Sequence, residues 1–200
     1  TDDPPGPCGV DSDPIVLTID PAATASAGAD ATICSNGTHT VSGTRGGSAS
    51  SSTWTTSGTG TFANASLVTT VYTPSAADIS AGTVNLTITT DDPVGQCTAA
   101  SDVLTLIIDA EATANAGADA TICEGSTYVL DGFLGGGASS LTWTTSGTGT
   151  FDDATIVSAT YTPSVADISS GSLTLTITSD DPPGPCLSAT DNMILTINLD

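Results

Sequence analysis

The feature that most constrains this chain is an internal repeat. The nine residues WTTSGTGTF occur twice, at 54–62 and again at 143–151, which sets a period of 89 residues (143 − 54). The pattern D-D-P-x-G-x-C occurs three times at the same spacing and ends at Cys8, Cys97 and Cys186. A fixed period of this length indicates a tandem array in which each repeat folds as one unit.

At this period the 200 residues hold two full repeats and a remnant. We expect repeat 1 to cover 21–109 and repeat 2 to cover 110–200, each the size of a small domain with one core. Residues 1–20 would be the C-terminal hairpin and strand of a preceding repeat. Because the chain begins inside a repeat, we expect it to belong to a longer secreted protein whose targeting signal lies elsewhere.

Short segments of alternating apolar and polar residues, separated by turn signals, predict β-strands throughout both repeats. In repeat 1 the predicted strands are 29–34, 38–43, 53–56, 61–62, 68–72, 83–89 and 103–108. In repeat 2 they are 118–123, 127–130, 141–145, 156–161, 173–178 and 193–198. Residues 15–19 predict a further strand whose partners are missing from this chain or supplied by another copy.

These elements predict an all-β fold of tandem immunoglobulin-like β-sandwiches. The only predicted helix is a single turn in each repeat, where Ser75 with Asp78, and Ser164 with Asp167, fit a capping box. The linkers near 20–22 and 109–111 are very short, which predicts a linear array with little rotation between repeats.

The charge balance limits the partners that this chain can bind. It has 22 acidic side chains against one arginine and no lysine, a net charge of −21. Nothing here neutralises phosphate groups, so nucleic acids and anionic membrane surfaces are excluded as partners. We expect the partners to be other copies of the chain or adjacent repeats of the same polypeptide, with glycans and cations also compatible. No apolar run approaches the ~20 residues needed to span a membrane, so we expect no membrane insertion.

Several motifs together resemble a known family. These are the AGADATIC opening, a tryptophan on the third strand, Y-T-P-S-x-A-D-I, and the D-D-P-x-G-x-C turn. They resemble the tandem immunoglobulin-like, PKD-like repeats of very large secreted surface, adhesin and fibre proteins of bacteria, and the resemblance covers the whole chain. It implies a location outside the cell or on its surface. The W-D-F-G-D-G segment of many PKD domains is replaced here by WTTSGTG, so no function tied to that segment carries over.

The five cysteines favour disulfides, as expected for an extracellular all-β chain. In an immunoglobulin-like order Cys34 and Cys97 lie at opposite poles, separated by a strand of roughly 20 Å, whereas a disulfide needs Cα atoms within about 7 Å. We therefore favour an inter-repeat bond between Cys34 and Cys186, with Cys8, Cys97 and Cys123 bonding adjacent copies. The alternative is Cys34–Cys97 and Cys123–Cys186 within the repeats, with Cys8 left over.

Carboxylates cluster around the Pro/Gly turns, where calcium is one candidate ligand because it takes 6–8 oxygen atoms. The alternative is a solvated turn in which each aspartate accepts hydrogen bonds from nearby backbone. We expect no other cofactor. The candidate calcium ligands are Asp91, Asp92, Asp102, Asp180, Asp181 and Asp191.

The large aromatic side chains have two interpretations. Trp54, Trp143, Tyr72 and Tyr161 fill the cores of the sandwiches, or they form platforms on which sugars stack; the small number of other large residues favours the core. We expect no enzymatic activity and assign no catalytic residues, because the sequence lacks a nucleophile motif and a phosphate-binding loop.

Three functions remain. The leading hypothesis is a structural repeat segment of an extracellular bacterial fibre or surface stalk that supplies length and stiffness and assembles end to end into a filament. The second is an adhesin arm that binds a glycan or a protein. This binding either depends on calcium or does not. The third is a region accessory to a catalytic domain encoded beside these repeats.

Overall fold

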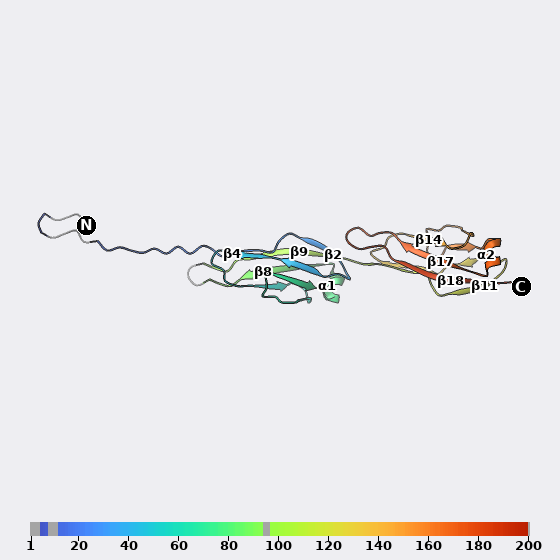
Figure 1. The fold of residues 1–200 in the computed structure, drawn as a ribbon, viewed down its shortest axis with the longest axis horizontal. Coiled ribbons are helices and arrows are strands. Elements are labelled where there is room, and N and C mark those ends of the chain that lie inside the picture. The colour runs from blue at the N-terminus through green and yellow to red at the C-terminus, as the bar shows by residue number, and fades with distance from the viewer. Residues whose placement is uncertain (1–4, 8–11, 94–96, 200) are drawn as a thin grey trace.

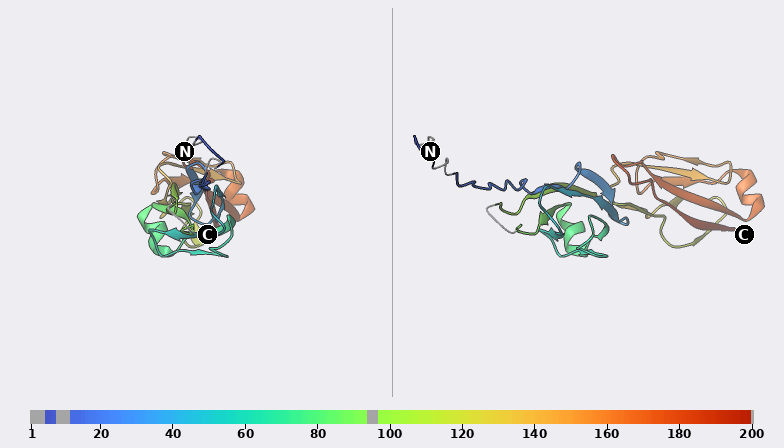
Figure 2. Two further views of the ribbon diagram at one scale, coloured as in Figure 1. Left: turned by 90° about the vertical axis from the view of Figure 1, so that its left-hand side faces the viewer. Right: turned by 60° about the vertical axis from the view of Figure 1, so that its left-hand side comes forward.

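The computed structural model describes residues 5–7, 12–93 and 97–199. Two β-sandwiches follow one another along the long axis, and residues 12–20 extend from the N-terminal end as an unpaired segment (Figure 1). Viewed along that axis, the second sandwich lies behind the first (Figure 2). The predicted all-β fold of tandem immunoglobulin-like sandwiches in a linear array is therefore confirmed. Within the described residues, neither helix has the length and apolar character needed to cross a membrane.

In its described residues, repeat 1 has nine strands and one helix. They are β1 (Thr24–Ser26), β2 (Ala31–Cys34), β3 (His39–Ser42), β4 (Thr44–Gly46), β5 (Ser52–Thr56), β6 (Thr61–Phe62), β7 (Thr69–Thr73), α1 (Ala76–Ala81), β8 (Thr83–Thr90) and β9 (Ser101–Asp109).

Repeat 2 follows the same order with small changes in length. Its elements are β10 (Ala112–Asn115), β11 (Ala120–Cys123), β12 (Tyr128–Val129), β13 (Phe133–Gly136), β14 (Leu141–Thr145), β15 (Thr150–Phe151), β16 (Thr160–Thr162), α2 (Val165–Ser170), β17 (Ser172–Ser179) and β18 (Thr190–Asn198).

The last strand of each repeat lies inside a four-stranded sheet. In repeat 1 the strand order is β2-β9-β8-β5, and in repeat 2 it is β11-β18-β17-β14. β9 pairs antiparallel with β8 and parallel with β2, whose first residue Ala31 lies opposite Leu106. The facing layer is formed by the sheets β3-β7-β6 and β1-β4 in repeat 1, and by β12-β16-β15 and β10-β13 in repeat 2.

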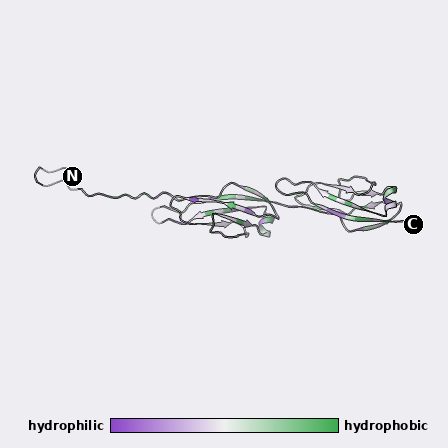
Figure 3. Ribbon diagram, in the orientation of Figure 1, coloured by the Kyte–Doolittle hydropathy of each residue, from purple (hydrophilic) through white to green (hydrophobic). Residues whose placement is uncertain are grey.

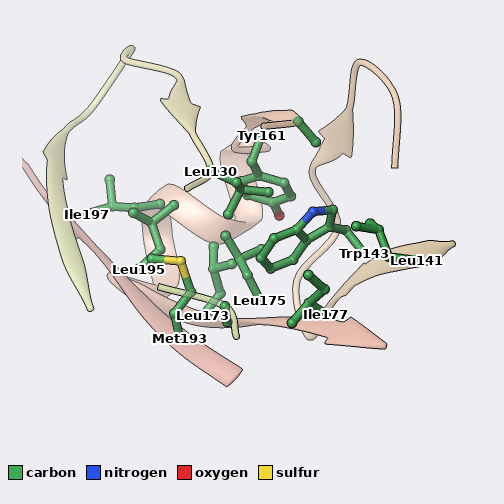
Figure 4. Packing of buried hydrophobic residues seen from close by; sticks show 12 residues of the cluster. Leu130, Leu141, Trp143, Tyr161, Leu173, Leu175, Ile177, Met193, Leu195 and Ile197 are labelled. Carbon is green, nitrogen blue, oxygen red and sulfur yellow. The ribbon is translucent and has the colours of Figure 1, made fainter. Parts of the chain in front are cut away.

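The core of each repeat lies between these two layers. Alternate residues of β8 and β9 point inward, because successive side chains of a strand point to opposite faces; Leu86, Ile88 and Leu106 are fully buried. Trp54 and Trp143 are each 2% exposed, so their predicted place in the cores is confirmed. Figure 4 shows the corresponding cluster of repeat 2 around Trp143, and Figure 3 shows apolar residues distributed along the strands of both sandwiches.

The start of each repeat differs from the prediction. The strand expected at 29–34 forms as β2, but β1 precedes it, a strand that the sequence did not predict and that belongs to the other layer. β1 pairs with β4, whereas β2 pairs with β9. Gly28, with a φ of 91°, lies between them and adopts a left-handed conformation that favours glycine. Gly117, with a φ of 86°, does the same in repeat 2.

Two other predicted strands also change. Residues 156–161 were expected to pair along their whole length, but β16 begins only at Thr160. A turn precedes this strand. The Asp153 carboxylate closes the turn by accepting hydrogen bonds from the Thr155 N–H (2.9 Å) and hydroxyl (2.6 Å). Residues 15–19 are extended and exposed and pair with nothing in the described part of the chain.

Candidate functional site

The repeated WTTSGTG motif builds a binding site for one of the protein's own carboxylates. Asp78 is the third residue of helix α1, which Ser75 caps, and its side chain is 3% exposed. Its Oδ1 accepts the N–H of Thr59 at 3.0 Å, and its Oδ2 accepts the N–H of Gly60 at 2.8 Å and the hydroxyl of Tyr72 at 2.8 Å. The Oδ2 atom also accepts the Ser75 N–H at 3.0 Å, which completes the capping box.

The hydrogen bonds decide the charge state of this buried group. Burial by itself raises the pKa of Asp78, but the donors from Ser75, Thr59 and Tyr72 outweigh it and lower the pKa from 3.8 to about 2. The negative charge also lies in the first turn of the helix, where the helix dipole stabilises it. The carboxylate is therefore ionised and fully engaged by the fold, and it is not available to an external ligand.

Repeat 2 reproduces the same site. Asp167 accepts the N–H groups of Thr148 and Gly149, each at 2.8 Å, and the hydroxyl of Tyr161 at 2.8 Å. The glycine of the turn has no room for a side chain, because a Cβ on Gly147 would lie 2.2 Å from Asp167 Oδ1. These contacts account for the Gly-Thr-Gly part of the identical nine residues. The capping box was visible in the sequence, but the contribution of the tyrosine and of the turn was not.

The second cluster of polar contacts lies at the junction between the repeats. A disulfide joins Cys34, at the end of β2, to Cys186 in repeat 2, with Cα atoms 5.0 Å apart and a sequence separation of 152 residues. Beside it the Asn36 Nδ2 donates to Glu111 Oε1 at 2.9 Å, and the Glu111 N–H donates to Ser35 Oγ at 3.0 Å. A hollow of about 420 Å³ lies next to the disulfide and is lined by residues of both repeats.

The D-D-P-x-G-x-C turn of repeat 2 packs directly against the end of repeat 1. A Cβ on Gly184 would lie 2.1 Å from Asp109 Oδ2, and Gly184 has a φ of 99°, so glycine is required on two counts. Two residues later in the same turn, the Cys186 Sγ lies 3.4 Å from the Asp109 carbonyl oxygen. In repeat 1 the equivalent Cys97 places its Sγ 3.7 Å from the carbonyl oxygen of Asp20.

The remaining cysteines divide between the described and undescribed parts of the chain. Cys97 is half-buried and Cys123 is exposed, and neither is bonded in the structure. Cys8 lies outside the described residues. By the 89-residue period Cys97 corresponds to Cys186 and Cys123 to Cys34, so Cys97 lies at the N-terminal end of repeat 1 and Cys123 at the C-terminal end of repeat 2.

The candidate calcium ligands of repeat 1 do not converge. Asp91 accepts hydrogen bonds from the N–H of Ser50 (2.9 Å) and of Ser51 (3.0 Å), so it closes the loop before β5. Asp102 points elsewhere, because its Oδ2 accepts the N–H of Ala27 at 2.8 Å. Bonds from the serine hydroxyl and the backbone lower the pKa of Asp91 and keep it ionised.

The candidate calcium ligands of repeat 2 follow the same division. Asp180 accepts the N–H of Ser139 at 2.8 Å, and Asp191 accepts the N–H of Ala116 at 2.8 Å. Across the described ranges no three Asp, Glu, His or Cys side chains gather in a way that could hold a metal ion. Asp92 and Asp181 join no such cluster. Calcium binding at these turns stays a prediction.

Comparison with known proteins supports the fold. No protein-family model matches the chain, and no curated protein sequence matches it. Among solved structures it is similar to human CDH23 EC21-23, with a TM-score of 0.51 and 13% identity over 90% of this chain and 66% of that one. It is also similar to mouse Cadherin-23 EC22-24, with a TM-score of 0.49 and 13% identity over 90% of this chain and 67% of that one.

The chain thus spans about two thirds of these two solved fragments, and 50% of the fragment of Drosophila N-cadherin EC1-4, which it matches with a TM-score of 0.45 and 13% identity over 90% of its own length. At this identity the likeness establishes the fold alone. The chain shares its fold with the human CDH23 EC21-23 fragment.

Proposed function

We propose that this chain is a structural segment of an extracellular bacterial fibre or surface stalk, in which the repeats supply length and stiffness. The observation that supports this most directly is the junction, where the disulfide between Cys34 and Cys186 joins two sandwiches that follow one another in line. Domains that move freely relative to one another are joined by long linkers, whereas only Ala110 and Glu111 separate β9 from β10.

Stiffness follows from having two covalent connections at one junction. A single short linker permits bending about one point, but the disulfide adds a second covalent connection. The hydrogen bonds that Glu111 makes to Ser35 and Asn36 occupy the same interface. A bend that opened one side of the junction would have to stretch one of these connections. The net charge of −21 also opposes compaction through repulsion between like charges.

End-to-end assembly is the second part of the proposal. Cys123 occupies in repeat 2 the position that Cys34 occupies in repeat 1, and Cys97 occupies the position of Cys186, because both pairs are 89 residues apart (123 − 34; 186 − 97). We propose that Cys123 of one copy bonds Cys97 of the next and that Cys8 also bonds an adjacent copy. A head-to-tail contact of this kind does not close on itself, so it generates a filament.

The stiffness is tested by removing only the inter-repeat bond. The double variant Cys34→Ser with Cys186→Ser should keep both sandwiches folded but broaden the distribution of distances between a spin label on each repeat. The control is Cys97→Ser with Cys123→Ser, which should leave the distribution unchanged. Equal distributions in the wild-type protein and in the Cys34/Cys186 variant would contradict a mechanical role for this bond.

Assembly is tested by oxidising the protein at high concentration. Non-reducing peptide mapping should give a linked peptide that contains Cys97 and Cys123, and electron microscopy should show linear multimers. The variant Cys123→Ser should remain monomeric under the same conditions. Dispersed monomers of the wild-type protein, both with and without added calcium, would remove the filament from the proposal.

A second candidate function, an adhesin arm, is favoured by one difference between the repeats. Phe133 on β13 is 62% exposed, whereas its counterpart in repeat 1 is Thr44. An exposed aromatic ring stacks on the apolar face of a neutral sugar, which suits a strongly acidic protein. A glycan array read with the wild-type protein and with Phe133→Ser tests this, with and without calcium. Signals that do not depend on Phe133 would argue against this surface as the glycan site.

A further inference from the structure

Asn36 and Gly37 form a dipeptide with a chemistry of its own. Of the asparagines in the chain, only Asn36 is followed by glycine. The backbone nitrogen that follows an asparagine can attack the side-chain amide carbon. A glycine in that place obstructs the attack least, because it has no Cβ. Among the asparagines of this chain, Asn36 is therefore the one most prone to lose its amide group.

The fold places this dipeptide at the junction between the repeats. It lies in the turn that follows β2, and the Gly37 N–H donates to the Cys34 carbonyl oxygen at 2.8 Å. The Asn36 side chain is exposed, and its Nδ2 donates across the junction to Glu111 Oε1 at 2.9 Å. Both groups that would react with each other are thus engaged in hydrogen bonds.

These two hydrogen bonds oppose the attack. The Gly37 nitrogen reaches the Asn36 Cγ only if its N–H leaves the Cys34 carbonyl oxygen. The Asn36 amide turns back onto its own main chain only if its Nδ2 leaves Glu111. Each hydrogen bond that has to break adds to the activation barrier. The amide is therefore protected in a closed junction and reactive in an open one.

Repeat 2 shows that the turn itself does not need an asparagine. One period later the two positions are occupied by Gly125 and Ser126. The Ser126 N–H donates to the Cys123 carbonyl oxygen at 3.2 Å, so the same turn forms without a side-chain amide. The amide of Asn36 therefore serves the contact across the junction and not the turn.

We propose that Asn36 is a site of spontaneous deamidation and that the junction controls its rate. The Gly37 nitrogen forms a bond to the Asn36 Cγ. Its proton passes through water to Nδ2, which leaves as ammonia when the Cγ–Nδ2 bond breaks. Water then adds to either carbonyl carbon of the cyclic imide and opens it to aspartate or isoaspartate. The only co-reactant is water, and the hollow of about 420 Å³ lined by Asn36 and Glu111 has room for it.

The product cannot restore the original contact. An ionised carboxylate at position 36 has no hydrogen to donate, and it places a second negative charge opposite Glu111. Isoaspartate also adds a methylene group to the main chain of the turn. Deamidation in an open junction therefore prevents the junction from closing with its original hydrogen bond. This consequence rests on the proposed mechanical role, whereas the reaction itself depends only on the turn and on Glu111.

The rate is tested by removing the acceptor of the amide. The wild-type protein and Glu111→Ala are incubated at neutral pH, and peptide mapping follows the conversion of Asn36 to aspartate and isoaspartate. The variant should react about fivefold faster, which is the factor that one hydrogen bond contributes to a rate. Equal rates would overturn control by the junction, and no conversion in either protein would overturn the site itself.

Gly37→Ser is the matched control, because repeat 2 carries serine at this position. The serine side chain obstructs the attack, so this variant should deamidate more slowly than wild type, with or without Glu111→Ala. Conversion as fast with serine as with glycine would show that the amide is not lost through attack by the following nitrogen.

The disulfide gives a second way to open the junction. Cys34→Ser with Cys186→Ser should also accelerate the conversion of Asn36. If Glu111→Ala accelerates it and the cysteine variant does not, the disulfide does not hold the junction closed. The proposed stiffness then fails, while the deamidation site stands.

The consequence is tested with a variant that carries the product of the reaction. Asn36→Asp should broaden the distribution of distances between spin labels on the two repeats, with the disulfide intact. Asn36→Asp combined with Glu111→Gln should restore the narrow distribution, because the glutamine amide can donate to the new carboxylate. If Asn36→Asp leaves the distribution unchanged, deamidation does not alter the junction.

Discussion

The two repeats hold their buried aspartates with the same set of core contacts, yet their distal poles differ. Asp78 and Asp167 each accept two backbone N–H groups of the glycine turn, one tyrosine hydroxyl and one capping N–H. At the poles the cysteine is common to both repeats, but the residues that follow it are not. Ser35 and Asn36 of repeat 1 correspond to Glu124 and Gly125 of repeat 2.

This difference separates two kinds of requirement. The contacts around the aspartate belong to the interior of one repeat, so every copy that folds needs all of them at once. The contacts at a pole depend on the neighbour: Ser35 and Asn36 bind Glu111, a residue that only the following repeat supplies. Gly125 has no side chain that could donate the bond that Asn36 makes. A junction formed there would share the cysteine and use other polar contacts.

The largest effect is expected from removing the carboxylate that both repeats share. Asp78→Ala should destabilise repeat 1, and Asp167→Ala should destabilise repeat 2, each by about 4 kcal/mol, because buried donors lose their charged acceptor. Amide exchange read from peptides of each repeat separates the two effects. Each variant should leave the other repeat within about 0.5 kcal/mol of wild type, as independent sites do. A loss spread equally over both repeats would contradict the reading of two separate cores.

Acid should affect both repeats together. Because the folded pKa of each aspartate is about 2 and its ordinary value is 3.8, the stabilisation is fully present above about pH 4 and is lost as the pH falls toward 2. The loss amounts to about 2.5 kcal/mol per repeat. Denaturant titrations between pH 5 and pH 2 measure it. The Asp78→Ala variant should show this dependence only in repeat 2.

A smaller effect is expected at the caps. Ser75→Ala and Ser164→Ala each remove the side-chain acceptor for the N–H of the third helical residue, at 3.2 Å and 3.1 Å. The cost should be about 1 kcal/mol in each repeat. Equal values in the two repeats, measured by chemical denaturation, would extend the similarity of the aspartate sites to the helix start. Unequal values would show that the shared contacts are energetically different.

The smallest change in stability should come from the poles. Ser35→Glu with Asn36→Gly gives repeat 1 the pole of repeat 2 and removes the side-chain contacts to Glu111. Because Asn36 is exposed and Ser35 is only half-buried, each repeat should change by less than about 0.5 kcal/mol. The orientation between the repeats should loosen, which residual dipolar couplings measured for each repeat can detect. A large loss of stability without a change in orientation would place these residues in the core of the fold.

Local sequence patterns were sufficient to predict the tandem organisation, most strands, the helical turn and the class of fold. These follow from local signals: the period of 89, the alternation along segments such as 83–89, and the spacing of Ser75 and Asp78. Each signal depends on residues that are close together in the sequence. The predicted strand positions were therefore close to the observed ones, but the layer to which each strand belongs could not be predicted.

Contacts between residues far apart in the chain could be identified only in the three-dimensional fold. The change of layer at Gly28, the parallel pairing of β2 with β9 and the tyrosine bound to the aspartate all join segments far apart in the chain. The disulfide between Cys34 and Cys186 depends on how two folded repeats stack, and two pairings were open until that stacking was known. The spacing of cysteines along a sequence cannot choose between them, because a bond within 7 Å depends on position in space.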